Sequence, residues 1–212
     1  MPKIQPFEEN TGRYEDWFSR HENAYLAEVR AIAQLMSPCR QGLESGVGSG
    51  RFAGQLGIRF GLDPSLRMLS LTGGRGILSA AGTGEALPFI DSCFDLTLMV
   101  TTVCFLDNVD GAFVEARRVL EPAGIFIIGL VDKNSPLGRL YLERSKKSVF
   151  YRSAEFYGVD EIVTHMKRAG FSDFQFRQTL FGSPGETPPS EPIKAGYGEG
   201  SFVAIKAVKE TG

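Results

Sequence analysis

The hydrophobic positions of this chain fall into short runs, most of them separated by segments whose apolar residues have helical spacing. Short continuous apolar runs are typical of strands buried on both faces of a parallel sheet. The predicted strands are one that ends at Glu44 and those at 56–62, 77–81, 94–100, 125–131, 171–181 and 201–208. Because the last two strands follow each other without a helix between them, we expect the final strand to be antiparallel in a mostly parallel sheet.

Segments with helical spacing lie between most of the predicted strands. Helices are predicted at 22–36, 51–56, 64–71, 112–120 and 153–169. Three further segments are expected to decorate the sheet: a helical N-terminal cap at 1–36, an inserted lid at 133–152 and a flexible, proline-rich loop at 182–200. Residues 1–20, 133–152 and 182–200 are expected to form a lid together. The length of 212 residues suits a single domain spanning 1–212.

Composition excludes several classes of function. The hydrophobic fraction of 42% and the charged fraction of 23% are ordinary for a soluble globular protein, and the net charge of −2 argues against nucleic-acid binding through net charge. No apolar run is long enough to cross a bilayer and the N-terminus lacks a signal-peptide core, so a cytoplasmic location without membrane association is expected. The three cysteines match no zinc or disulfide framework, so no metal site is expected.

The strongest candidate chemistry lies where glycine recurs at every second position after the first predicted strand. Gly46, Gly48 and Gly50 remove the Cβ atoms from a tight turn, which lets a ligand approach the backbone. A helix that begins after this turn would offer free N–H groups to an anionic or polar ligand. The dinucleotide spacing G-x-G-x-x-G would need a glycine at Arg51, which argues against a nicotinamide-dependent reductase.

Two acids flank this glycine turn. Glu44 ends the first predicted strand, and Asp63 ends the second, at about the separation where nucleotide-binding α/β units place a carboxylate on the ribose hydroxyls. The stretch from Glu44 to Gly50 resembles motif I, E-x-G-x-G-x-G, of the class I S-adenosylmethionine-dependent methyltransferases, in particular the methyltransferase type 11-like family. Ser45 stands where that family usually has an aliphatic residue.

A second stretch strengthens this resemblance. Residues 82–89, Gly-Thr-Gly-Glu-Ala-Leu-Pro-Phe, are similar to the family motif G-D-A-E-x-L-P-F, which contacts the adenine of the cofactor. Thr83 replaces the usual aspartate and Gly84 the usual alanine. The motifs occur in the order that the family has, which is more specific than any one of them alone.

The resemblance implies a Rossmann-like three-layer α/β sandwich with a seven-stranded, mostly parallel sheet of order 3-2-1-4-5-7-6 and an antiparallel last strand. It also implies S-adenosyl-L-methionine as cofactor, bound beyond the carboxyl ends of the strands at the switch point of the sheet. The cofactor-binding residues expected from it are Tyr14, Glu44, Gly46, Val47, Gly48, Asp63, Pro64, Met68, Gly84, Glu85, Ala86 and Thr101.

The methyl acceptor is less well marked. A small molecule is favoured over nucleic acid, because the Asn/Asp-Pro-Pro-Tyr motif of base amino methylation is missing after the fourth strand. Asp107 is the nearest carboxylate that could act as a base, although a solvent-facing loop acid is the favoured interpretation. The alternative to an enzyme is a methyltransferase-like protein that binds the cofactor and serves as a regulator or scaffold without turnover.

Four further features have both a functional and a structural interpretation. Tyr14 and Trp17 either face the pocket or pack the cap onto the core. The basic residues between 139 and 152 either bind an anionic substrate or RNA phosphate, or face solvent. Cys104 and the isolated His165 are expected to be structural.

Overall fold

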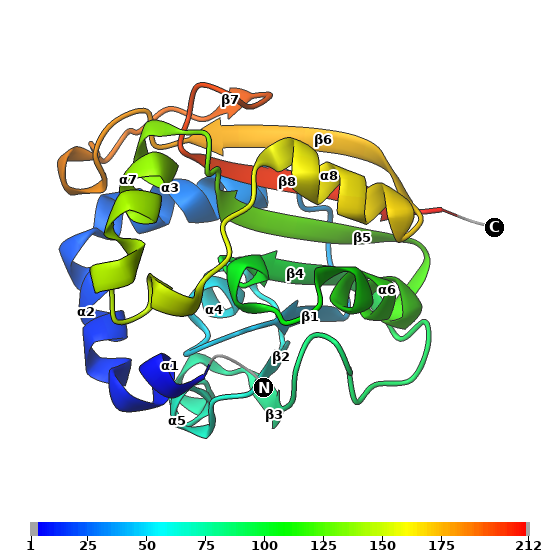
Figure 1. Ribbon diagram of the computed structural model, residues 1–212. Coiled ribbons are helices and arrows are strands. Elements are labelled where there is room, and N and C mark those ends of the chain that lie inside the picture. Colours follow the sequence, from blue (N-terminus) through cyan, green and yellow to red (C-terminus); the bar gives the residue numbers. More distant parts are fainter. Residues whose placement is uncertain (1–3, 211–212) are drawn as a thin grey trace.

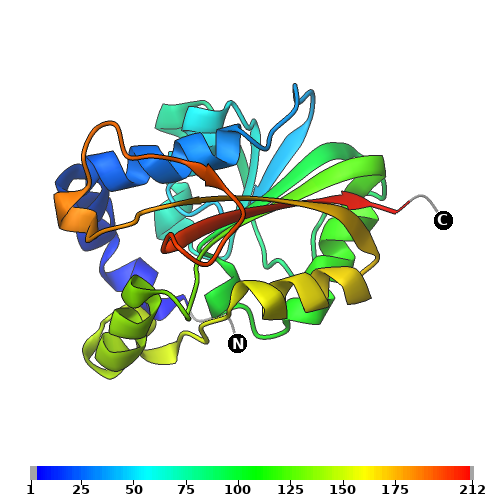
Figure 2. The same cartoon turned by 90° about the horizontal axis from the view of Figure 1, so that it is seen from above.

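The computed structural model describes residues 4–210, and over these residues it forms an eight-stranded sheet between two layers of helices (Figures 1 and 2). The strands are β1 (Gly42–Ser45), β2 (Phe60–Asp63), β3 (Leu78–Ala81), β4 (Phe94–Val100), β5 (Leu120–Val131), β6 (Phe171–Thr179), β7 (Lys194–Ala195) and β8 (Phe202–Lys209). Their order in the sheet is β3-β2-β1-β4-β5-β8-β6-β7. Strands β1 to β5 pair in parallel, whereas β8 is antiparallel to both β5 and β6.

The predicted fold class is therefore confirmed. The last strand of the chain, β8, lies antiparallel between β5 and β6, as the order 3-2-1-4-5-7-6 requires. The sheet has one strand more than predicted, because the short β7 pairs with the edge of β6 through Arg177 and Gln178. The 182–200 segment, which is predicted as a flexible loop, thus contains one short strand.

Helices cover both faces of the sheet. The α-helices are α1 (Gln5–Glu9), α2 (Thr11–Arg20), α3 (Glu22–Ala33), α4 (Arg51–Leu56), α5 (Leu66–Leu69), α6 (Val109–Val119), α7 (Pro136–Arg144) and α8 (Val159–Arg168). Single 3-10 turns are η1 (Gly73–Arg75), η2 (Val103–Phe105), η3 (Ser145–Lys147), η4 (Tyr151–Ser153) and η5 (Pro184–Glu186). The two views together place α3 and α4 on one face of the sheet and α6 and α8 on the other.

The two layers bury separate hydrophobic clusters, one on each side of the sheet. Successive residues of a strand point to opposite faces, and the buried second half of β5 shows this directly. Phe126 and Ile128 pack toward Phe113 of α6 and Met166 of α8, whereas Ile127 joins the cluster beneath α3. Apolar burial on both faces is the main stabilising contribution expected for such a strand. It explains why the central strands are continuous apolar runs.

Several helix boundaries differ from the sequence prediction because side chains cap the helices at other positions. Helix α5 begins at Leu66 rather than Pro64, since the Ser65 hydroxyl accepts a hydrogen bond from the Met68 N–H at 3.2 Å. Helix α8 begins at Val159 rather than at residue 153. There the Glu161 carboxylate reaches back to the Gly158 N–H at 2.7 Å.

The N-terminal helices and the segment after β5 gather at one edge of the sheet. Figure 1 shows α1, α2 and α7 beyond the ends of β4 and β5, which are the carboxyl ends of these strands. In open α/β sheets this edge is where ligands bind. Within residues 4–210, no helix is long and apolar enough to span a bilayer.

Candidate functional site

The glycine turn after β1 is held by main-chain contacts with β2. The Leu62 carbonyl accepts hydrogen bonds from the N–H groups of Gly46, at 2.7 Å, and Val47, at 2.9 Å. Gly46 and Gly48 have φ angles of 78° and 52°, in the left-handed region that favours glycine. A Cβ at Gly46 would lie 2.3 Å from the Thr102 side chain. Close packing against Thr102 therefore requires a glycine at position 46, whether or not a ligand approaches the backbone there.

The two acids that flank the turn have different roles. Glu44 is buried, and its carboxylate accepts a hydrogen bond from the Ala53 N–H at 2.8 Å, which fixes α4 to the end of β1. Asp63 accepts hydrogen bonds from the N–H groups of Gly48, at 2.9 Å, and Ser65, at 2.8 Å. Burial raises the pKa of both carboxyls, and these hydrogen bonds oppose the rise. Each Asp63 oxygen keeps a further lone pair for a ligand.

A cavity of about 1010 Å³ opens at the carboxyl edge of the sheet, beneath the cap helices. The predicted residues that line it are Tyr14, Gly46, Gly48, Asp63, Pro64, Met68, Gly84, Glu85, Thr101 and Asp107. Three predicted residues lie outside the lining: Glu44 holds α4, the Val47 side chain packs against Gly61, and Ala86 pairs with Thr83 in an isolated bridge. The sequence motifs thus meet at one cavity. Some of their residues line it, and Glu44, Val47 and Ala86 lie outside the lining.

Two of the three departures from the family motifs, Ser45 and Gly84, are neighbours in space. A Cβ on Gly84 would lie 3.1 Å from the Ser45 hydroxyl and 3.4 Å from the Leu106 side chain. The Ser45 hydroxyl is buried and has no hydrogen-bond partner among residues 4–210. A serine in β1 and a glycine in the second motif therefore fit one another at this wall of the cavity.

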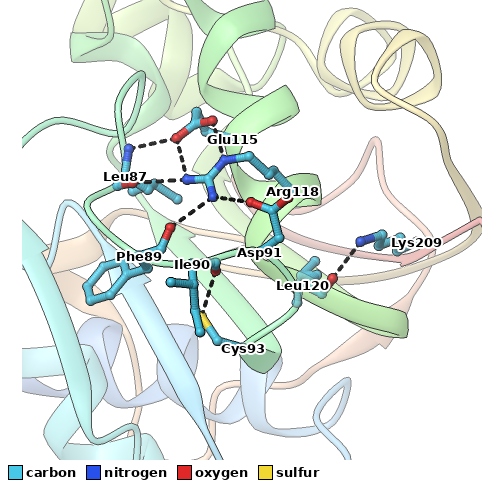
Figure 3. Close-up of polar contacts among 9 residues, drawn as sticks. All are labelled: Leu87, Phe89, Ile90, Asp91, Cys93, Glu115, Arg118, Leu120 and Lys209. Carbon is cyan, nitrogen blue, oxygen red and sulfur yellow. Dashed lines mark hydrogen bonds and ion pairs between the residues drawn. The ribbon is translucent and has the colours of Figure 1, made fainter.

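The segment that carries Glu85 is anchored on both sides. The Glu85 carboxylate accepts a hydrogen bond from the Asp107 N–H at 2.9 Å. Farther along, Arg118 of α6 donates to the carbonyls of Leu87, at 3.0 Å, and Phe89, at 2.8 Å. Figure 3 shows this arginine also paired with Glu115 and Asp91. A charged side chain on α6 thus holds the second motif beside the cavity.

A cluster of charged side chains fastens the cap to the glycine turn. Glu15 of α2 accepts a hydrogen bond from Ser49 and forms ion pairs with Arg51, at 2.6 Å, and Arg75, at 2.8 Å. Burial alone would raise the pKa of Glu15, but the hydrogen bonds from Arg51 and Ser49 lower it below its usual value. Tyr14, one residue earlier, places its hydroxyl 3.3 Å from where a Cβ on Gly48 would lie. The cap therefore closes directly over the turn.

The end of β4 meets the turn at the centre of the cavity. Thr101 has a φ of 51°, which is uncommon for a β-branched residue, and its N–H donates to the Gly129 carbonyl at 2.7 Å. The hydroxyl of Thr102 donates to the Val100 carbonyl at 3.0 Å. Strained backbone of this kind clusters at binding and catalytic sites.

The cavity has two sides, which we name by their residues. The glycine side is lined by Gly46, Gly48, Asp63, Gly84 and Glu85, at the ends of β1 and β2 and after β3. The Glu28 side is lined by Trp17, Glu28, Val131, Tyr141 and Tyr151, which come from α2, α3, the end of β5, α7 and η4. Thr101 lies between them, because β4 separates β1 from β5 in the sheet.

Sequence reasoning missed Glu28. Its side chain lines the cavity although the residue is only 4% exposed, and burial raises the pKa of its carboxyl to about 8. The signal was present in the sequence: Glu28 stands among Tyr25, Val29 and Ile32, which are buried residues of the same helix. An acid on an apolar helix face is a stronger candidate than an acid in a loop.

The other candidate residues lie at the rim or elsewhere. Asp107 is exposed at the cavity wall. His165 pairs with Asp110 at 2.6 Å, and neither lines the cavity. Cys104 borders a smaller hollow beside it. In residues 4–210, no group of three or more metal-ligating side chains comes together.

The predicted lid segments contribute unequally. The cavity lining includes residues of the cap and, from the 133–152 insertion, Tyr141, Arg144, Lys147, Ser148, Phe150 and Tyr151. No residue of the 182–200 segment lines the cavity. Its Glu191 instead accepts a hydrogen bond from the Phe181 N–H at 2.9 Å, which ties the segment to the end of β6. The expectation that this segment helps to form a lid is therefore not supported by its position.

Proteins of known sequence or structure resemble this chain over most of its length. The family described as "Methyltransferase domain" matches residues 43–128. A crystal structure from Thermotoga maritima, described as a SAM-dependent methyltransferase and possible histamine N-methyltransferase, superposes with a TM-score of 0.94 at 45% identity, covering 97% of this chain and 98% of that one. An uncharacterised protein of Methanocaldococcus jannaschii is 39% identical over 96% of this chain and 98% of its own. An uncharacterised protein of Mycobacterium tuberculosis is 36% identical over 99% of this chain and 76% of its own.

Proposed function

Because this chain belongs to the S-adenosylmethionine-dependent methyltransferases, we propose that it binds S-adenosylmethionine on the glycine side of its cavity and methylates a small molecule on the Glu28 side. The observation that carries the proposal is the meeting of both sequence motifs at one cavity, at the switch point between β1 and β4. That is the place where open α/β sheets bind nucleotides.

The residues present on the glycine side fit an adenosine-bearing ligand. Asp63 lies in the cavity wall with oxygen lone pairs available for a ribose diol. Gly46 and Gly48 expose backbone between this acid and Thr101. Pro64 and Met68 supply apolar surface beside Asp63, suited to a flat aromatic base. Asp63 would thus hold the ribose, and the glycine turn would hold the amino-acid end.

When bound, S-adenosylmethionine supplies a methyl group already activated on a sulfonium, so the protein need not provide a nucleophile. The protein contributes position and the exclusion of water. Thr101 and Thr102, fixed by hydrogen bonds to Gly129 and Val100, hold the wall between the two sides rigidly. Residues of α1, α2 and the 133–152 insertion cover the cavity, which supports their role as a lid.

The shape of the Glu28 side favours a small acceptor over a macromolecule. Its walls come mainly from aromatic side chains, and Tyr141 and Tyr151 stack with ring centroids 5.2 Å apart. Apolar walls with few polar groups are typical of small-molecule sites. The description of the Thermotoga maritima relative as a possible histamine N-methyltransferase points in the same direction.

The experiment that tests this proposal is calorimetric titration with S-adenosylhomocysteine, followed by transfer from methyl-labelled S-adenosylmethionine to a metabolite mixture. We expect saturable binding by the wild type. Asp63→Asn should bind about tenfold to a hundredfold more weakly, because hydrogen bonds to a charged group are lost. Asp16→Asn, at an exposed acid of α2 outside the cavity lining, is the matched control and should bind like the wild type.

Two results would remove the proposal. The first is absence of S-adenosylhomocysteine binding at millimolar ligand. The second is equal affinity in the wild type and Asp63→Asn. Labelled product in the transfer assay would in addition exclude a cofactor-binding scaffold without turnover.

A further inference from the structure

The Glu28 side of the cavity contains a buried carboxyl that the proposed function leaves unused. Glu28 projects from α3 into the cavity wall and is 4% exposed. In residues 4–210, no hydrogen bond or ion pair reaches its carboxylate. A buried acid without a partner is costly to ionise. Such a group is therefore expected either to stay protonated or to receive a partner from a ligand.

Aromatic rings surround this acid on the lid side. Tyr141 and Tyr151 line the same side of the cavity and stack at an interplanar angle of 24°. Burial raises the pKa of Tyr141 to about 12, and the charge of Glu28, which lines the same cavity, adds to the rise. Trp17 of α2 also lines the cavity. A carboxylate combined with aromatic faces is a site for a cation.

The charges of the rim do not supply that cation. Arg13 and Arg20 of α2 and Arg144 and Lys147 of the lid also line the cavity, but all four are exposed to solvent. Burial is the cause of the raised pKa of Glu28, and these exposed charges do not offset it. The interior of the Glu28 side therefore carries one acid, while the positive charges remain at the mouth.

We propose that the methyl acceptor is an amine, and that its ammonium group binds Glu28 between the aromatic rings of Trp17, Tyr141 and Tyr151. This inference rests on the proposed function, since it assigns the acceptor of the same site. The position is suitable for transfer, because the Glu28 side includes Val131 at the end of β5, whereas Asp63 ends β2. These strands are three strand spacings apart, about 14 Å, with Thr101 between them.

The same carboxylate can prepare the amine for reaction. An ammonium nitrogen has no lone pair, so it must lose a proton before it can accept a methyl group. In this step the nitrogen–hydrogen bond breaks, its electron pair stays on nitrogen, and an oxygen–hydrogen bond forms on Glu28. The pair changes from ammonium and carboxylate to neutral amine and carboxylic acid. Burial raises the pKa of this carboxyl to about 8, so Glu28 holds a proton more readily than an exposed carboxyl does.

The titratable groups that face Glu28 are few. Tyr25 of α3, Tyr141 of α7 and Tyr151 of η4 interact with its charge, and burial raises the pKa of all three phenols, so they remain neutral near pH 7. Free Glu28 should therefore be mostly protonated at pH 7. Binding of an ammonium ion would favour its carboxylate and release close to one proton to the buffer.

Calorimetry on the full chain saturated with S-adenosylhomocysteine tests the inference, with 2-phenylethylamine and methylamine as probes at pH 7. Titrations in two buffers of different ionisation enthalpy measure proton release. We expect the wild type to bind at least one of the amines with release of close to one proton, and 2-phenylethanol to bind at least tenfold more weakly than 2-phenylethylamine. Glu28→Gln should lose at least tenfold in amine affinity and release no proton.

The matched control is Glu143→Gln, an exposed acid of α7 outside the cavity lining, which should behave like the wild type. Affinity for S-adenosylhomocysteine should be the same in all three proteins. Absence of that binding in the wild type contradicts the proposed function. Where S-adenosylhomocysteine binds normally, three results contradict only the present inference. These are absence of amine binding, equal amine affinity in the wild type and Glu28→Gln, and equal affinity for the alcohol and the amine. The wild-type proton release decides the matter even where Glu28→Gln fails to fold.

Discussion

The two sides of the cavity differ in how completely their polar groups are satisfied. On the glycine side, Asp63 accepts two backbone hydrogen bonds, and the nearby Glu44 accepts one behind the wall. On the other side, Glu28 is only 4% exposed and has no partner within residues 4–210. A satisfied acid shapes a binding surface that exists before the ligand arrives. An unsatisfied acid is an acceptor that the ligand itself must complete.

The two sides are also assembled differently. The residues of the glycine side follow β1, β2 and β3 directly, so short segments of chain carry them. The Glu28 side brings together α2, α3, the end of β5 and the 133–152 insertion. This comparison suggests that the glycine side is common to proteins that use this cofactor, whereas the Glu28 side sets the choice of acceptor. The predictions below test that division, beginning with the largest expected effect.

Gly46→Val should abolish binding of S-adenosylhomocysteine. A Cβ at this position would lie 2.3 Å from Thr102, and valine is strained at a φ of 78°. The turn must therefore move away from β4. Gly73→Ala, where a Cβ meets nothing within 4 Å, is the control and should bind normally. Calorimetry measures both, and circular dichroism checks that each protein is folded. Undiminished affinity in folded Gly46→Val would show that the turn does not shape the binding surface.

Glu28→Gln should change how stability depends on pH. The folded pKa of Glu28, about 8, lies above the usual carboxyl value, so the native state holds a proton that the unfolded chain has lost. Wild-type stability should therefore fall between about pH 4.5 and pH 8, by up to roughly 1.4 kcal/mol per pH unit from this group. Glu28→Gln lacks this loss, so the difference in free energy of unfolding should grow in its favour as pH rises.

Urea denaturation at pH 5 and pH 8 measures this difference. Glu143→Gln serves again as the control, because its exposed carboxyl should leave the pH dependence unchanged. Parallel pH profiles for wild type and Glu28→Gln would mean that Glu28 is not buried in its protonated form.

Glu15→Gln should loosen the attachment of the cap to the glycine turn. It weakens the contacts with Arg51 and Arg75, which are partly buried, and we expect a loss of about 1–2 kcal/mol in the free energy of unfolding at pH 7. The pKa of Glu15 is lowered in the folded state, so this contribution is present above the usual carboxyl pKa and is lost as pH falls through the folded value. Glu22→Gln, at an exposed acid of α3, is the control.

Denaturation midpoints at pH 7 and pH 3 decide the Glu15 prediction. The difference between wild type and Glu15→Gln should shrink at the lower pH. A constant difference would indicate that the loss comes from packing and not from the charge.

Arg144→Ala and Lys147→Ala should have the smallest effects. Both residues are exposed at the rim, where solvent and salt screen their charges. We expect less than about threefold change in the affinity of 2-phenylethylamine for each variant, to be measured at low and physiological salt. A loss of amine affinity as large as that expected for Glu28→Gln would show that the residues of the rim, and not Glu28, recognise the acceptor.

The fold and the glycine side could be predicted because their signals are local in the chain. The apolar runs give the strands, and the residues from Glu44 to Gly50 stand together in sequence as they do in space. Helix boundaries were less predictable, since the caps by Ser65 and Glu161 depend on single side-chain hydrogen bonds. Strand β7 was missed because its two residues carry too little pattern to be distinguished from a loop.

The Glu28 side could not be assembled from the sequence for a physical reason. Its members are joined only by the packing of α3 and the 133–152 insertion around the end of β5, and no spacing rule links them. Glu28 was overlooked because the other buried residues of its helix are apolar residues and Tyr25, which are typical of a hydrophobic core. Asp107 was a candidate base because it follows a predicted strand, yet it is exposed whereas Glu28 is buried.

A crystal structure with S-adenosylhomocysteine and 2-phenylethylamine bound together is the measurement that tests the division of the cavity most directly. We predict that the ribose hydroxyls lie within hydrogen-bond distance of the Asp63 carboxylate. We also predict that the amine nitrogen lies beside Glu28, with its lone pair directed toward the sulfur of S-adenosylhomocysteine. Adenosine bound away from Asp63, or an amine bound at the rim with Glu28 still unpaired, would contradict this account.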